Sequence, residues 1–171
     1  MEYSIKGIIF IICVLAVTVY LIVVAIEDAK TMEVTRGKHL IGFIPAVVVW
    51  ILCASERNIC DIGIIILFVG LWMLCGWIRV YGMADGFVFA NLTLFFGGIG
   101  GVAGVGVVIL ILVLAGFSGV VEILARKMAT IKNFRENRKI AFVPHILVGY
   151  VVVLWLILLI EVLENKPFGG V

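Results

Sequence analysis

Two aspartates, Asp28 and Asp85, are the residues of this sequence best suited to chemistry. Each adjoins a long uncharged run, and a carboxylate beside or inside a bilayer costs about 2.5–3.5 kcal/mol on insertion scales. An acid placed there at this cost is expected to have a function and a partner residue. Two carboxylates that share a site cannot both ionise cheaply, so one keeps a proton while the other stays charged. As in aspartic peptidases, the charged member can activate water while the protonated member stabilises an oxyanion, without a metal or cofactor.

Each aspartate also has a purely structural interpretation. Asp85 follows Tyr81-Gly82-Met83-Ala84, and an aspartate that begins a helix can act as its N-cap by accepting hydrogen bonds from free amides. Asp28 ends an apolar run, where a negative charge is unfavourable for the helix dipole. Glu27 is a rival for the role of Asp28, because adjacent helical residues face different directions and spacing alone does not choose between them.

The rest of the sequence is that of an integral membrane protein. Of its 171 residues, 64% are hydrophobic and 14% are charged, and the mean hydropathy is +1.30. The net charge of +2 gives little support to nucleic-acid binding. The uncharged runs predict an all-α polytopic membrane protein, a single domain over 1–171. Its six transmembrane helices are expected in one bundle, over about 7–26, 40–54, 62–78, 86–97, 99–121 and 140–160.

The fourth and fifth of these helices come from a single run, 86–121, which is about twice the length needed to cross a bilayer. It contains Gly97-Gly98-Ile99-Gly100-Gly101, where the chain can reverse. The glycine pairs Gly97/Gly101 and Gly100/Gly104 are each four residues apart, which predicts close packing of the two helices.

Positive charges predict the orientation. Ten of the 13 Lys and Arg residues fall in the connectors after the first, third and fifth helices, six of them in 122–139. Short cytoplasmic loops carry such an excess. We therefore expect a multi-pass cell-membrane protein with both termini outside and these three connectors in the cytoplasm. Asp28, at the end of the first helix, and Asp85, at the start of the fourth, then lie at the same cytoplasmic face.

Three segments resemble the type IV prepilin peptidases and archaeal preflagellin peptidases, intramembrane aspartic peptidases of the GxGD type. The segment 28–35 is similar to the family's segment after its first core helix. Gly82-Met83-Ala84-Asp85 is similar to its second catalytic motif, and 140–149 to the run that opens its last helix. The sequence departs from the family at Ala84, where glycine is usual, at Thr35, where proline is common, and at Ala141, where proline or glycine stands.

The resemblance implies that Asp28 and Asp85 are the catalytic pair of a cofactor-free endopeptidase. Its substrate is then a prepilin or pseudopilin, from which it removes a short basic leader at the cytoplasmic face of the membrane, for type IV pilus assembly or protein secretion. The paired-cysteine methyltransferase domain of bifunctional members is absent, so the chain is similar to the short peptidase-only forms and no methylation is expected.

Two other functions compete with this one. A small proton- or cation-coupled transporter with a carboxylate pair predicts an acid near the bilayer midplane, whereas both aspartates fall at helix ends. A non-catalytic scaffold predicts that replacement by asparagine is harmless at both positions.

The remaining polar residues have weaker interpretations. Candidate acceptors for a basic leader are Glu27, Glu33, Glu122 and Glu136. Arg79 could tune the aspartates, although an interfacial arginine is the simpler interpretation. His39 and His145 are interpreted as packing residues, with substrate contact as the alternative. Pro144 is expected in the first turn of the last helix. The cysteines Cys13, Cys53, Cys60 and Cys75 lack metal-site spacing, and free thiols are favoured over a Cys53–Cys60 disulfide.

Overall fold

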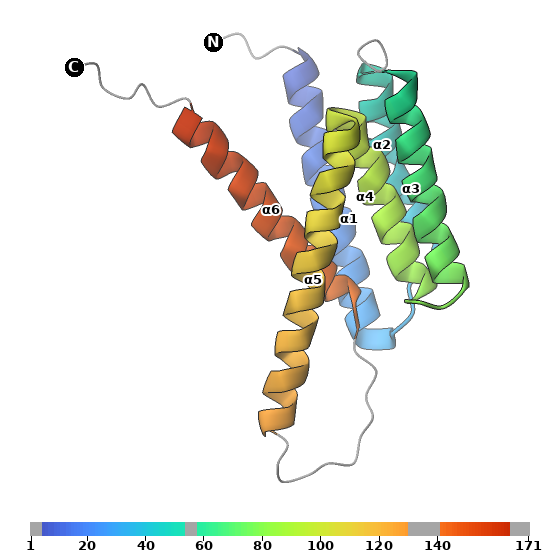
Figure 1. Ribbon diagram of the computed structural model, residues 1–171, viewed down its shortest axis with the longest axis vertical. Coiled ribbons are helices and arrows are strands. Elements are labelled where there is room, and N and C mark those ends of the chain that lie inside the picture. Colours follow the sequence, from blue (N-terminus) through green and yellow to red (C-terminus); the bar gives the residue numbers. More distant parts are fainter. Residues whose placement is uncertain (1–4, 54–57, 130–140, 165–171) are drawn as a thin grey trace, which may run out of the picture.

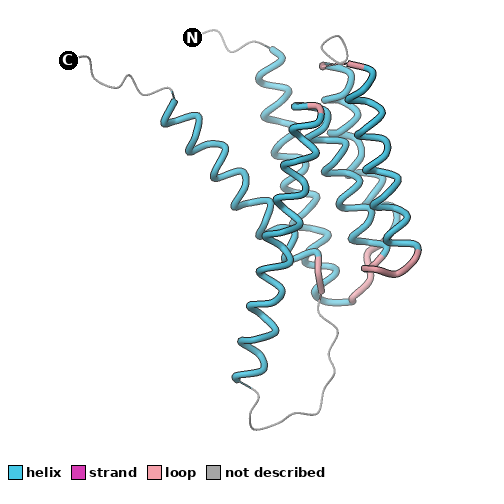
Figure 2. Tube along the Cα trace, in the orientation of Figure 1, coloured by secondary structure: helices cyan, strands magenta, loops and turns pink. Residues whose placement is uncertain are grey.

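The computed structural model describes residues 5–53, 58–129 and 141–164, and within them every regular element is a helix (Figures 1 and 2). The helices are α1 (Ile5–Thr31), α2 (Arg36–Leu52), α3 (Ile59–Trp77), α4 (Met83–Gly100), α5 (Val102–Ala129) and α6 (Val143–Glu164). All except α2 are long and apolar enough to cross a membrane, and α2 adds a shorter apolar stretch, Gly37–Leu52. The chain is therefore an all-α, polytopic helical membrane protein.

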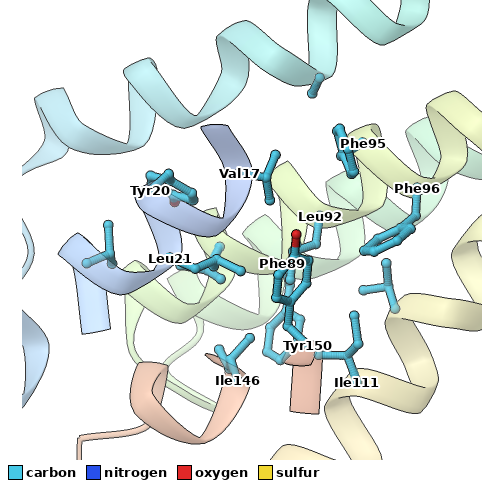
Figure 3. Packing of buried hydrophobic residues seen from close by; sticks show 14 of the residues in the cluster. Val17, Tyr20, Leu21, Phe89, Leu92, Phe95, Phe96, Ile111, Ile146 and Tyr150 are labelled. Carbon is cyan, nitrogen blue, oxygen red and sulfur yellow. The ribbon is translucent and has the colours of Figure 1, made fainter. Parts of the chain in front are cut away.

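Helix α4 is the centre of the packing. Most of its residues are buried, and it contacts α2, α3 and α5. In Figure 3 its side chains Phe89 and Leu92 lie between Leu21 of α1 and Ile111 of α5, with Tyr150 of α6 close by. Because neighbouring helices cover most of α4, the residues at its ends also lie among several helices.

Glycines allow the closest approaches between helices. A Cβ atom on Gly104 of α5 would lie 1.9 Å from the Phe96 carbonyl oxygen of α4, and one on Gly149 of α6 would lie 2.7 Å from the Ile111 carbonyl oxygen of α5. The predicted close packing of α4 and α5 is confirmed. The break between them lies at Gly101, whose φ of +58° suits glycine, slightly later than predicted.

The helices extend beyond the uncharged runs. Helix α1 continues to Thr31, α4 begins at Met83, and α5 continues to Ala129, so Glu122 and Arg126 are helical. The reason is that helical hydrogen bonding does not stop where the apolar residues do, and an uncharged run marks only the apolar part of a helix. Helix α2 runs uninterrupted through Pro45. The rest of the predicted basic connector, 130–140, lies outside the described residues.

The connector between α2 and α3 contains no disulfide. Cys53, at the end of α2, and the exposed Cys60, in the first turn of α3, are both free, as are Cys13 and Cys75. The preference for free thiols is confirmed and the Cys53–Cys60 disulfide is wrong. Instead, the Asn58 side chain caps α3 by accepting a hydrogen bond from the Cys60 amide at 3.3 Å.

A buried polar cluster joins α1, α2 and α4. The Asn91 side-chain amide donates to the Tyr20 hydroxyl at 3.0 Å and to the His39 carbonyl oxygen at 3.2 Å. The Tyr20 hydroxyl in turn lies 2.9 Å from His39 Nδ1, and the His39 ring stacks on Phe87 with centroids 4.9 Å apart. These contacts support the packing interpretation of His39.

Candidate aspartate site

Three helix ends come together at one end of the bundle, the lower end in Figure 1. They are the last turn of α1, which carries Asp28, the first turn of α4, which carries Asp85, and the first turn of α6, which begins at Val143 and includes Pro144 as predicted. Both aspartate side chains belong to residues only 7% exposed. The fold therefore gathers two acids that are 57 residues apart in sequence.

Asp28 binds the beginning of α6. Its Oδ2 accepts a hydrogen bond from the Val143 amide at 3.1 Å. The first amides of a helix have no partner within the helix, and the helix dipole favours a negative charge there. Sequence reasoning missed this amide. It could have been found because Asp28 is expected at the same face of the membrane as the start of the last helix, where free backbone amides lie.

Asp85 lies at the third position of α4, not at its N-cap. The N-cap is Gly82, and the Asp85 Oδ2 accepts a hydrogen bond from the Gly82 amide at 3.0 Å. The N-cap interpretation is therefore wrong in position, because the helix begins at Met83. A carboxylate at the third position can still reach back to the N-cap amide, and so Asp85 does stabilise the helix start. This hydrogen bond uses one of the two carboxylate oxygens of Asp85.

The two carboxylates are close enough to interact electrostatically. Like charges repel strongly in surroundings of low dielectric constant, so keeping both acids here is costly unless they share a proton. Two aromatic residues are near the pair in sequence: Phe89 lies one turn after Asp85 on α4, Phe142 precedes the Val143 that binds Asp28, and their ring centroids are 6.4 Å apart. The two nearly buried acids therefore lie at the edge of an apolar core.

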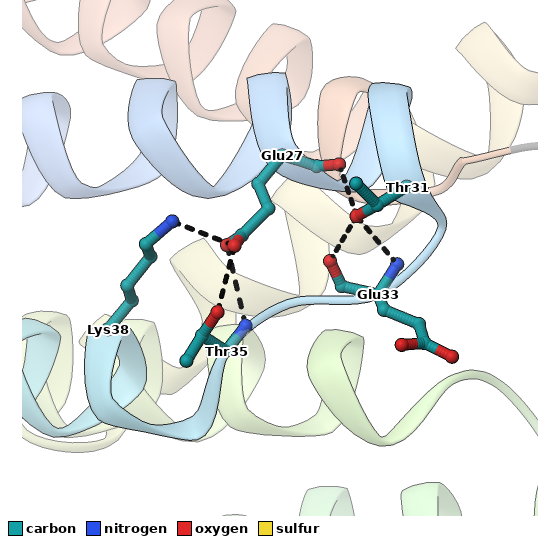
Figure 4. Close-up of polar contacts among 5 residues, drawn as sticks. All are labelled: Glu27, Thr31, Glu33, Thr35 and Lys38. Carbon is teal, nitrogen blue, oxygen red and sulfur yellow. Dashed lines mark hydrogen bonds and ion pairs between the residues drawn. The ribbon is translucent and has the colours of Figure 1, made fainter.

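Glu27, the sequence rival of Asp28, belongs to a different set of contacts. Its carboxylate faces the α1–α2 connector, where it pairs with Lys38 Nζ at 2.8 Å and accepts hydrogen bonds from Thr35 Oγ1 at 2.9 Å and from the Thr35 amide at 3.4 Å (Figure 4). The structure therefore separates two adjacent acids: Glu27 anchors the connector, and Asp28 faces α6 and Asp85.

Two further residues of the α3–α4 connector flank the site. Tyr81 donates its hydroxyl hydrogen bond to the Trp72 carbonyl oxygen at 2.8 Å. Burial raises the pKa of the Tyr81 phenol, which keeps it a donor. Sequence reasoning did not single out Tyr81. Arg79 is exposed, has a φ of +62° and forms no ion pair with either aspartate among the described residues.

His145 lies next to this site but faces α5. Its Nδ1 is 2.9 Å from Ser118 Oγ and its Nε2 is 2.8 Å from Glu122 Oε2. Glu122 also forms an ion pair with Arg126. Of the predicted leader acceptors, Glu27 and Glu122 thus already have cationic or histidine partners, Glu33 is exposed, and Glu136 lies outside the described residues.

In the part of the chain that the structure describes, no group of three or more His, Cys, Asp or Glu side chains could hold a metal ion. No protein-family model, curated protein or solved structure matches the chain. A function must therefore be argued from the aspartate site itself.

Proposed function

We propose that the chain is an intramembrane aspartic endopeptidase that removes the short basic leader of a prepilin-like substrate at the cytoplasmic face of the membrane. The observation that carries this proposal is the pairing of Asp28 and Asp85, two nearly buried carboxylates brought together from α1 and α4. The resemblance of their sequence surroundings to the prepilin and preflagellin peptidases supports it.

In the proposed reaction, the charged aspartate takes a proton from water as the water oxygen attacks the scissile carbonyl carbon. The protonated aspartate donates its proton to the carbonyl oxygen and stabilises the tetrahedral intermediate. That intermediate collapses when the C–N bond breaks: the leaving amine takes the proton held by one aspartate, and the other aspartate takes a hydroxyl proton from the intermediate as the carboxylic acid forms, so the pair again holds one proton. Asp28, which accepts a hydrogen bond from an amide at the start of α6, where the helix dipole favours a negative charge, is the better carrier of the charge, and Asp85 the better carrier of the proton.

The proposal includes a six-span topology with both termini outside. Helix α2 has 17 residues and is about 26 Å long, close to the ~30 Å thickness of a bilayer's hydrocarbon core. Lys30 and Lys38 lie at the same end of the bundle as the aspartates, and positive charges favour the cytoplasmic side. A cytoplasmic leader would then meet the membrane where the two acids are.

The test is cleavage of a prepilin-like substrate by purified protein in detergent. Asp28→Asn and Asp85→Asn keep the size of the side chain but remove the acid, and each is expected to lower kcat by at least about 10³-fold with little change in folding. Glu27→Gln is the matched control, because it changes the adjacent acid at a structural ion pair. It should stay within about threefold of the wild-type rate, since this half-buried ion pair lies on the α1–α2 connector and touches neither aspartate.

Three outcomes would count against the proposal. Wild-type cleavage rates in either asparagine variant would make that aspartate structural. If Glu27→Gln also abolished cleavage, any change at this end of α1 would impair the protein, and the losses in the asparagine variants would not identify catalytic acids. A wild type that cuts none of several leader-bearing substrates would leave the proton- or cation-coupled transporter as the function to test.

A further inference from the structure

The first turn of α6 is held against α5 by a buried histidine that the aspartate pair does not use. His145 is only 6% exposed. Its Nδ1 is hydrogen-bonded to Ser118 Oγ at 2.9 Å, and its Nε2 lies 2.8 Å from Glu122 Oε2, within ion-pair distance but outside hydrogen-bond geometry. Ser118 and Glu122 are one turn apart on α5. Between them, Gly119 lies against the ring: a Cβ atom there would be in ordinary van der Waals contact with His145 Cδ2, at 3.7 Å.

This arrangement joins α5 to Asp28 through the backbone of α6. His145 lies two residues after Val143, whose amide donates to Asp28, and the His145 amide donates to the Phe142 carbonyl oxygen at 3.0 Å. Residues 142–145 thus form one hydrogen-bonded turn. Because the buried imidazole is hydrogen-bonded to Ser118 and lies against Glu122, this turn has little freedom to slide or rotate on α5, and the Val143 amide stays directed at Asp28.

A serine-type hydrolytic centre is the other chemistry that a Ser–His–Glu set suggests, but the surroundings of Ser118 disfavour it. Ser118 lies in the middle of α5, where the neighbouring backbone amides are used in the helix. An oxyanion requires free donors beside the nucleophile, which a strand-to-helix turn supplies and a helix interior does not. Glu122 is also shared with Arg126. The cluster is better suited to fixing geometry.

We propose that His145 is a positioning residue of the aspartate site: by bridging Ser118 and Glu122 of α5 it sets the α6 amides that orient the Asp28 carboxylate. The inference rests on the proposed peptidase function for its effect on catalysis, although its effect on the α6 amides can be measured without any substrate. A misplacement of about 1 Å at a reacting group can cost roughly 100-fold in rate.

The experiment compares His145→Leu, which removes both ring contacts, with His145→Gln, which keeps one polar contact. Two readouts are measured on the full-length protein in detergent: kcat and KM for a prepilin-like substrate, and hydrogen exchange of the backbone amides in 142–146. We expect His145→Leu to lower kcat by about 10- to 100-fold with KM nearly unchanged, and to speed exchange at Val143. His145→Gln should restore part of the lost kcat and part of the lost protection of the Val143 amide.

Tyr150→Phe is the matched control, because it also removes a hydrogen bond of α6, here between the Tyr150 hydroxyl and Thr18 Oγ1 at 3.0 Å, but away from the first turn. It should lower thermal stability while leaving kcat and Val143 exchange near wild type. Equal losses of kcat in Tyr150→Phe and His145→Leu would overturn the inference in favour of general destabilisation. A rise in KM at constant kcat would overturn it in favour of substrate contact.

The two readouts also separate this inference from the proposed function. If the wild type cleaves no substrate, the peptidase proposal fails, but accelerated Val143 exchange in His145→Leu would still show that His145 sets the α6 amides. If the wild type cleaves and His145→Leu matches it in both kcat and exchange, the positioning role is wrong and the peptidase proposal stands.

Discussion

Asp28 and Glu27 are chain neighbours of the same chemical type, yet the fold gives them different surroundings. The roughly 100° rotation between adjacent helical residues directs Asp28 towards α6 and Asp85, and Glu27 towards Lys38 and Thr35. Sequence could narrow the candidates to these two acids but not choose between them. The choice depends on which face of α1 packs on α6, a property of the tertiary contacts.

Glu33 is the remaining described candidate for recognising a basic leader. It is exposed on the α1–α2 connector, where its backbone contacts Thr31 while its side chain points away (Figure 4). We expect Glu33→Lys to raise KM by roughly threefold to tenfold for a substrate with a basic leader, because an exposed attraction becomes a repulsion.

The measurement is KM at low and high salt, since screening should shrink the difference between variant and wild type. A substrate whose leader lysines and arginines are replaced by glutamine is the control, and Glu33→Lys should leave its KM unchanged. An equal rise in KM for both substrates would mean that Glu33 does not recognise leader charge.

At the scale of helices, the sequence predicted the number of elements and the glycine break, and missed where the ends lie. Uncharged runs locate the apolar part of each helix, but Asp28 and Asp85 lie in turns that continue past those runs. The N-cap at Gly82 and the binding of Asp28 to α6 both depend on those extra turns. The Gly82 cap is local, but no local pattern encodes the binding of Asp28 to α6, because it forms only when these helix ends meet.

The α4–α5 contact provides a prediction on helix packing. Gly104→Ala would place a methyl group 1.9 Å from the Phe96 carbonyl oxygen, so the two helices must separate. We expect a loss of about 1–3 kcal/mol in the free energy of unfolding. Thermal unfolding of the purified variants in detergent would measure it.

Gly106→Ala is the matched control on the same helix, since nothing lies within 4 Å of its added Cβ atom. It should leave stability unchanged or raise it by up to about 1 kcal/mol, because alanine is the better helix former. Equal destabilisation by the two substitutions would mean that backbone flexibility, not close contact, explains the glycines of α5.

For the whole molecule, the proposed reaction depends on which side of the membrane the aspartates face. Cys60 begins α3 at the end of the bundle opposite the aspartates and is exposed, whereas Glu33 follows α1 at their end. In a protein whose other cysteines are replaced by alanine, a membrane-impermeant maleimide applied to intact cells should label Cys60. In the same background with Cys60 also replaced, it should label Glu33→Cys only after permeabilisation.

The reversed pattern would place Asp28 and Asp85 outside the cell, where no cytoplasmic leader can reach them, and would exclude leader removal even if both acids prove essential. Labelling of both positions from one side would instead mean that α2 does not cross the membrane, because α2 is the one helix between Glu33 and Cys60. The membrane crossing of α2 needs this test because its apolar stretch is shorter than the five helices that are long enough to cross a membrane. Labelling on opposite sides therefore tests both the span count and the cytoplasmic position of the aspartates, on which the proposed cleavage depends.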